Sequence, residues 1–117
     1  MAERRPKLLF DAIAATDAAM GFIAGHDLAA YEANLLLRSG VERQLEILGE
    51  ACARLLREDA SIGRDVPASR MAIGLRNRII HGYDGIDDET IYRTVLDDLP
   101  ERRADLTSRL ARFDPTT

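Results

Sequence analysis

The sequence is poor in cysteine, histidine and aromatic residues, and the first two shortages limit the chemistry that the chain can carry. Its one cysteine cannot form an internal disulfide bond, which fits the reducing cytosol, so we expect a cytoplasmic protein. Its two histidines lie far from each other and from the cysteine, and they form no cluster with the spacing of a metal site. We therefore expect neither a bound metal ion nor another cofactor.

Long hydrophobic runs are also missing. No stretch approaches the run of about 20 apolar residues that a membrane-spanning helix needs. The first ten residues begin with basic side chains but contain neither a long apolar run nor a small-residue cleavage site, so we predict no signal peptide. We therefore expect no membrane partner.

Lysine is almost absent, and the acidic residues outnumber the basic ones. The net charge of −4 argues against a protein that coats nucleic acid non-specifically, although it leaves room for a local basic site. Lys7 is the only lysine, so fifteen of the sixteen basic residues are arginine. Arginine favours paired contacts with phosphate and carboxylate oxygens, although most of these residues are expected to form ordinary surface ion pairs.

The pattern that is present is helical. A chain of 117 residues is long enough for one domain, which we place at residues 1–117 with a frayed tail from 114. Apolar residues recur at steps of four and three, and no alternating strand pattern occurs. The predicted fold is all-α, an antiparallel bundle of four main helices plus short helical segments. The expected helices cover residues 5–25, 28–31, 33–59, 68–81, 90–99 and 101–113, with a connector at 60–67 and a break at Pro100.

The longest predicted helix, residues 33–59, has two unusual features. Apolar residues lie beyond its core stripe, and a second apolar side on a small domain indicates a partner subunit. Gly49 lies in mid-helix, where glycine costs about 1 kcal/mol relative to alanine, so we expect another helix to approach closely there. We interpret the neighbouring Glu50 as an exposed glutamate, with a site acid as the alternative. Cys52 falls on the core stripe and is predicted to be buried.

The most informative stretch is residues 71–83, which combines an apolar stripe with arginine, histidine and tyrosine. Asn77 and His81 are four residues apart, so they share one face of a helix, and Gly82 is expected to end that helix. Arginine, imidazole and a tyrosine hydroxyl at a helix end form a candidate site for phosphate chemistry. Spacing alone favours Asn77 or Arg78 over Arg76 as the neighbour of His81. In the purely structural alternative, Arg76 forms a salt bridge with Asp84, Asp87 or Glu50, and His81 caps the helix.

The run RNRIIHGY, from Arg76 to Tyr83, resembles the RxxxxHxY signature of the HEPN superfamily in its HepT-like branch. The run VERQLEILGEACA, residues 41–53, resembles the long second helix of the same branch, and the likeness covers most of the chain. The resemblance implies a homodimeric, HEPN-like helical fold. It selects Arg76 and His81 as catalytic residues, Asn77 and Arg78 as supporting residues, and Tyr83 as an RNA contact or a site of AMP transfer.

The resemblance also implies a function. HEPN ribonucleases cleave RNA without a metal ion at a composite arginine–histidine site across a dimer interface. HepT-like members act as toxins, and a minimal (MNT-type) nucleotidyltransferase serves as the antitoxin by transferring AMP to the tyrosine. Such an adenylate would place bulk and negative charge beside the arginines and block an RNA phosphate. The alternatives are a non-catalytic helical adaptor that binds a nucleotidyltransferase and presents its substrate, and a purely structural dimer.

Overall fold

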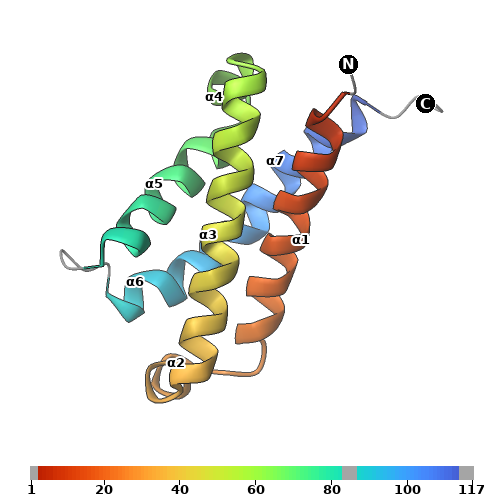
Figure 1. Cartoon of the computed structure of the whole chain (residues 1–117). Coiled ribbons are helices and arrows are strands. Elements are labelled where there is room, and N and C mark those ends of the chain that lie inside the picture. The colour runs from red at the N-terminus through yellow and green to blue at the C-terminus, as the bar shows by residue number, and fades with distance from the viewer. Residues whose placement is uncertain (1–2, 83–86, 114–117) are drawn as a thin grey trace.

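The computed structural model describes residues 3–82 and 87–113, and every element of these ranges is helical (Figure 1). Four main helices run in alternating directions, as predicted, and the remaining elements are short helices of five or six residues. The main helices are α1 (Arg5–Ile23), α3 (Leu35–Glu58), α5 (Pro67–His81) and α7 (Leu99–Ala111). The short elements are α2 (Leu28–Ala33), α4 (Ser61–Asp65), α6 (Asp88–Arg93) and the π-helical turn η1 (Thr94–Asp98).

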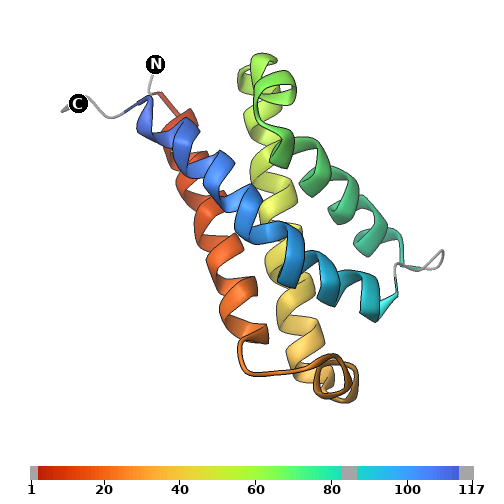
Figure 2. The same ribbon diagram turned by 180° about the vertical axis from the view of Figure 1, so that it is seen from behind.

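Helix α3 is the central element of the bundle, with α1 along one side and α5 along the other (Figure 1). Its predicted core stripe is confirmed, because all of its members are buried. Burial raises the pKa of the Cys52 thiol to about 12, which makes this side chain an inert part of the core. Seen from behind, α6, η1 and α7 form one diagonal run that crosses the α1–α3 pair (Figure 2). The buried stripe of α3 consists of Val41, Leu45, Leu48, Cys52 and Leu55.

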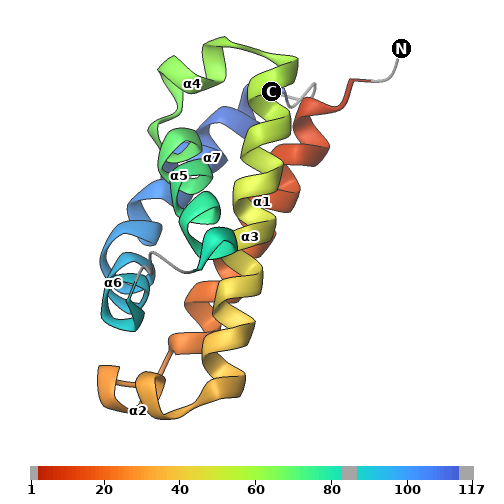
Figure 3. The same ribbon diagram turned by 60° about the vertical axis from the view of Figure 1, so that its left-hand side comes forward.

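Short polar residues begin three of the helices. The side chains of Asp27, Asn34 and Asp87 each accept a hydrogen bond from the backbone N–H three residues later, at 2.8, 3.0 and 2.7 Å. The cap at Asp27 confirms the predicted short helix, which continues to Ala33. Figure 3 shows α2 at one end of the bundle, between α1 and α3, and α4 at the opposite end.

Two local predictions were wrong. The expected connector at residues 60–67 contains the short helix α4, whose Ile62 and Gly63 are buried. The expected break at Pro100 is absent, because the chain passes from α6 to α7 through the π-helical turn. In this turn the N–H of Leu99 donates to the carbonyl oxygen of Thr94, five residues earlier. Pro100 then lies in the first turn of α7, where a missing N–H costs nothing.

A polar cluster joins the outer ends of α1, α3 and α7. Asp59 follows α3, and its carboxylate accepts hydrogen bonds from Arg5 at 2.8 Å and from Arg109 at 3.2 Å. Its other oxygen accepts bonds from the backbone N–H and the hydroxyl of Ser61. Arg109 is only 8% exposed, so Asp59 supplies the counter-charge of a buried cation.

Candidate functional site

The motif helix α5 ends where the sequence predicted. His81 is its last residue, and Gly82 follows with a φ of +66°, a left-handed conformation that glycine adopts without strain. The N–H of Gly82 donates to the carbonyl oxygen of Arg78 at 3.2 Å and closes the last turn. His81 is exposed, so its imidazole lies at the protein surface beside the carbonyl end of the helix.

Arg76 lies on a different side of α5 and points toward α3. Its guanidinium forms an ion pair with Glu50, with 3.1 Å between Nη2 and Oε2. A second N–H, on Nη1, donates to the side-chain oxygen of Asn77 at 3.2 Å. The Arg76 side chain is 28% exposed, so it is partly open to solvent. The salt bridge predicted as the structural alternative is therefore present, with Glu50 as the partner.

Gly49 explains why Arg76 lies so close to α3. A Cβ atom at residue 49 would come within 2.8 Å of the backbone carbonyl oxygen of Ala72 and would also overlap Cβ of Arg76. The predicted close approach of another helix at Gly49 is confirmed, and that helix is α5. Because Glu50 is the next residue, this contact places its carboxylate beside the Arg76 guanidinium.

The other predicted site residues lie around the end of α5. Asn77 and Arg78 are exposed. The pKa of Asp87 is lowered, mainly by its hydrogen bonds with Thr90 and to a lesser degree by the charge of Arg78. The structure therefore brings Arg76 into contact with Asn77, while Arg78 belongs to the surroundings of Asp87. Tyr83 lies outside the described residues, so the structure does not test its predicted role.

Arg54 of α3, which was expected to form a surface ion pair and was not predicted as a site residue, completes the charged cluster. Its Nε–H donates to Oε1 of Glu50 at 2.9 Å, so Glu50 binds one arginine with each carboxylate oxygen. The hydrogen bond from Arg54 is the main reason why the pKa of Glu50 is lowered, and the charges of Arg76 and Arg57 add to it. Arg54 is four residues after Glu50, the helical spacing that favours an ion pair on one face.

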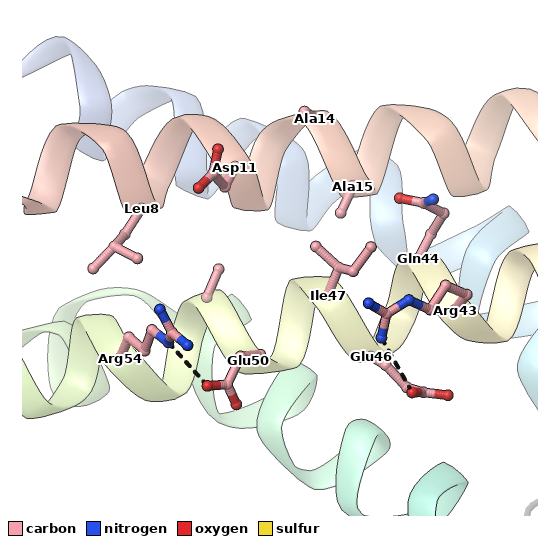
Figure 4. Close-up of a pocket in the computed structure, with 11 residues that line it drawn as sticks. Leu8, Asp11, Ala14, Ala15, Arg43, Gln44, Glu46, Ile47, Glu50 and Arg54 are labelled. Carbon is pink, nitrogen blue, oxygen red and sulfur yellow. Dashed lines mark hydrogen bonds and ion pairs between the residues drawn. The ribbon is translucent and has the colours of Figure 1, made fainter.

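An open groove of about 440 Å³ runs between α1 and α3 next to this cluster (Figure 4). Glu50 and Arg54 lie on its α3 side, one turn from the ion pair of Arg43 with Glu46, and Leu8 and Asp11 lie on its α1 side. The groove therefore shares Glu50 with the Arg76 site, but it contains none of the predicted catalytic residues.

The described residues contain no group of three or more histidine, cysteine, aspartate or glutamate side chains that is arranged to hold a metal ion. What they do contain is a half-open guanidinium with a fixed carboxylate partner and an exposed imidazole on one helix. A guanidinium can bind two phosphate oxygens, and an imidazole can accept or donate a proton near neutral pH. None of the helices in the described part of the chain combines the length and hydrophobicity needed to cross a bilayer.

Comparisons with known proteins agree with this chemistry. A family model described as "Ribonuclease HepT-like" matches residues 12–108. A protein of Methanocaldococcus jannaschii, whose name describes it as a candidate RNase, is 32% identical over 93 residues, which cover 80% of this chain and 84% of that protein. A second candidate RNase of the same organism is 28% identical over 80% of this chain and 79% of its own length.

A further relative carries the family name itself. A protein of Thermococcus cleftensis, described as a candidate ribonuclease HepT, is 35% identical over 60 residues, 51% of this chain and 54% of its own. No solved structure shows significant similarity to the chain. The family model covers most of the sequence, including the whole of α5. The chain therefore belongs to the HepT-like ribonuclease family of the HEPN superfamily.

Proposed function

We propose that this protein is a metal-independent endoribonuclease in which Arg76 and His81 are the catalytic residues. The observation that carries the proposal is the arrangement of α5, which presents a partly exposed guanidinium and an exposed imidazole on one helix. The imidazole would accept a proton from the 2′-hydroxyl as it attacks the phosphorus, and an imidazolium would donate a proton to the leaving 5′-oxygen. The guanidinium would stabilise the negative charge that develops on the phosphorane oxygens in the transition state.

RNA cleavage by the purified chain in the presence of EDTA tests this proposal. We expect a fluorescent oligoribonucleotide to be cut by the wild-type chain and not by Arg76→Ala or His81→Ala. His26→Ala is the matched control, because His26 is the only other histidine and lies in the α1–α2 connection. Arg64→Ala is the control for arginine, because Arg64 is exposed on α4 and pairs with Asp65. Cleavage that disappears with EDTA, or that survives in His81→Ala, would contradict the proposal.

The active form in this proposal is a homodimer in which two copies of α5 face one cleft. Ile80, next to His81, is 52% exposed, and an apolar side chain of that size beside a polar site is a surface that a second copy would cover. Leu35 and Leu36 at the start of α3 are even more exposed, in line with the second apolar side predicted for that helix. Light scattering with Ile80→Glu tests the dimer, and we expect the variant to be monomeric and inactive.

We further propose that the enzyme is the toxin of a type VII-like HEPN/MNT toxin–antitoxin pair and that its antitoxin transfers AMP to Tyr83. The other two tyrosines support Tyr83 as the acceptor, because both are buried. The Tyr92 hydroxyl donates to the carbonyl oxygen of His26 at 2.7 Å, and the Tyr31 ring is fully buried against the Tyr92 ring.

This finer proposal needs the partner protein. Incubation with a small nucleotidyltransferase from a neighbouring gene and with ATP is expected to add one AMP to Tyr83, to abolish cleavage, and to leave Tyr83→Phe unmodified. A stable complex with the nucleotidyltransferase but neither cleavage nor AMP transfer would instead identify the chain as a non-catalytic adaptor.

A further inference from the structure

Glu50 forms the ion pair that links α3 to the motif helix α5. Its two carboxylate oxygens bind different arginines, Arg54 of its own helix at 2.9 Å and Arg76 of α5 at 3.1 Å. We propose that Glu50 is the positioning residue of Arg76, which holds the guanidinium in place for the phosphate of the substrate. This inference rests on the proposed ribonuclease function.

The stem of Arg76 has little freedom to move. Gly49 allows the first side-chain atoms of Arg76 to pack directly against the backbone of α3, and a Cβ at residue 49 would overlap them. The position of the head then depends on its two hydrogen-bonding partners, Glu50 and Asn77. A long arginine side chain loses much rotamer freedom when it is held in this way, so the cost of ordering is met before a substrate arrives.

The pair with Glu50 leaves Arg76 able to bind a phosphate. A guanidinium has five N–H donors, and Glu50 and Asn77 use one each. The remaining donors include N–H groups on adjacent nitrogens, which is the arrangement that binds two phosphate oxygens. Glu50 and an RNA phosphate can therefore bind the same guanidinium together, so Glu50 need not leave during the reaction.

Arg54 explains why the carboxylate does not cancel the positive charge of the site. Glu50 carries one negative charge, whereas Arg54, Arg57 and Arg76 all act on it. The cluster therefore keeps a positive excess at the junction of α3 and α5. It also keeps Glu50 ionised, so the carboxylate remains a charged partner for Arg76.

Steady-state kinetics on the full-length chain test the inference, with Glu46 as the matched control. Glu46 lies one turn before Glu50 on α3 and lines the same groove, but it pairs with Arg43, whereas Arg76 pairs with Glu50. A misplacement of about 1 Å in a catalytic group can cost about 100-fold in rate, and we expect Glu50→Ala to lower kcat roughly tenfold with KM within about twofold. Glu50→Gln keeps an oxygen that can accept from Arg76, so its loss of kcat should be smaller. Glu46→Ala should match the wild type.

The midpoint of thermal unfolding separates a loss of Arg76 positioning from a loss of folded protein. Glu50→Gln preserves the size of the side chain, and we expect its midpoint to equal that of Glu46→Gln. The inference is overturned if Glu50→Ala and Glu46→Ala have the same kcat while Arg76→Ala is inactive, a result that leaves the proposed function intact. It is also overturned if kcat falls only in variants whose midpoint falls to the assay temperature. A wild-type chain without ribonuclease activity overturns both proposals.

Discussion

Two carboxylates at the two ends of the C-terminal half of α3 each bind two arginines, but they differ in what surrounds them. Asp59 binds Arg5 and Arg109, and its side chain is 17% exposed. Glu50 binds Arg54 and Arg76, and its side chain is 39% exposed. The same chemistry therefore occurs once in a nearly closed setting and once in an open one.

The difference lies in how far each carboxylate is enclosed and in how many helices it joins. Asp59 also accepts bonds from Ser61, and Arg109 is buried, so the cluster encloses its carboxylate and one of its arginines and ties α1, α3 and α7 together, although Arg5 stays 31% exposed. The Glu50 cluster joins only α3 and α5 and leaves donors of Arg76 open to solvent. We interpret the Asp59 cluster as structural and the Glu50 cluster as part of the site, and variants in each can separate the two roles.

The largest effect on stability is expected at Arg109. Breaking a buried ion pair costs about 3–5 kcal/mol, and we expect Arg109→Ala to lower the free energy of unfolding by about 2–4 kcal/mol because Asp59 keeps Arg5 and Ser61. Arg54→Ala removes the corresponding arginine from Glu50 at an exposed position, where an ion pair contributes about 0–1 kcal/mol.

Urea unfolding at one protein concentration, followed by circular dichroism, measures both free energies. Equal losses in the two variants would contradict the distinction between a structural and an open cluster. A large loss in Arg54→Ala alone would reverse the two assignments.

Much of the fold could be predicted from the sequence, because the apolar periodicity of α3 matches its buried stripe. The buried stripe of α3 and the glycine at its crossing with α5 follow from local spacing. The Asp59 cluster could not be predicted, since Arg5 and Arg109 are 54 and 50 residues away and no local pattern connects them. The prediction at Pro100 was wrong for a different reason. Proline was interpreted as a helix break, but here it lies in the first turn of α7, directly after a π-helical turn.

The candidate site could be predicted only in part from the sequence. Spacing placed Asn77 and His81 on one face and marked the end of α5 at Gly82. It did not select Arg76, because the direction of that side chain depends on how α5 crosses α3. The resemblance to the family selected Arg76, and the structure selects Glu50 among the possible salt-bridge partners of Arg76 and adds Arg54 beside it. The catalytic roles of these residues stay predictions.

The next largest effect on stability is expected at Gly49. Alanine there would bring Cβ within 2.8 Å of the Ala72 carbonyl oxygen, so α5 would have to move away from α3. We expect Gly49→Ala to cost about 1–3 kcal/mol in the free energy of unfolding. It should also lower ribonuclease activity, because the displaced backbone carries Arg76 away from Glu50.

Gly74 provides the control for Gly49. It lies in the interior of α5, where an added Cβ would meet no atom within 4 Å, so Gly74→Ala should stabilise the protein by up to about 1 kcal/mol through helix propensity. Comparing the changes in unfolding free energy of Gly49→Ala and Gly74→Ala separates the cost of the steric clash from the gain in helix propensity. A stabilising effect of Gly49→Ala in urea unfolding would mean that the two helices are not in close contact.

The smallest effect is expected in acid, where the two carboxylates should differ. The pKa of Asp59 is lowered to about 2, first by its hydrogen bond with the Ser61 hydroxyl and then by Arg5, and the pKa of Glu50 is lowered mainly by Arg54. Unfolded carboxyl groups titrate near 4, so both groups stabilise the fold fully above that pH and lose this contribution as the pH falls through their folded pKa. The loss therefore falls between about pH 4 and pH 2 for Asp59.

Replacing each carboxylate by its neutral amide removes the part of the pH dependence of the unfolding free energy that this carboxylate causes. Asp59→Asn should flatten the acid side of the stability curve between pH 4 and pH 2, whereas Glu50→Gln should change it little because solvent screens an exposed pair. Adding salt sharpens the contrast, since screening weakens exposed pairs more than enclosed ones. If Glu50→Gln flattened the curve as much as Asp59→Asn, the distinction between an enclosed cluster at Asp59 and an open, screened cluster at Glu50 would be wrong.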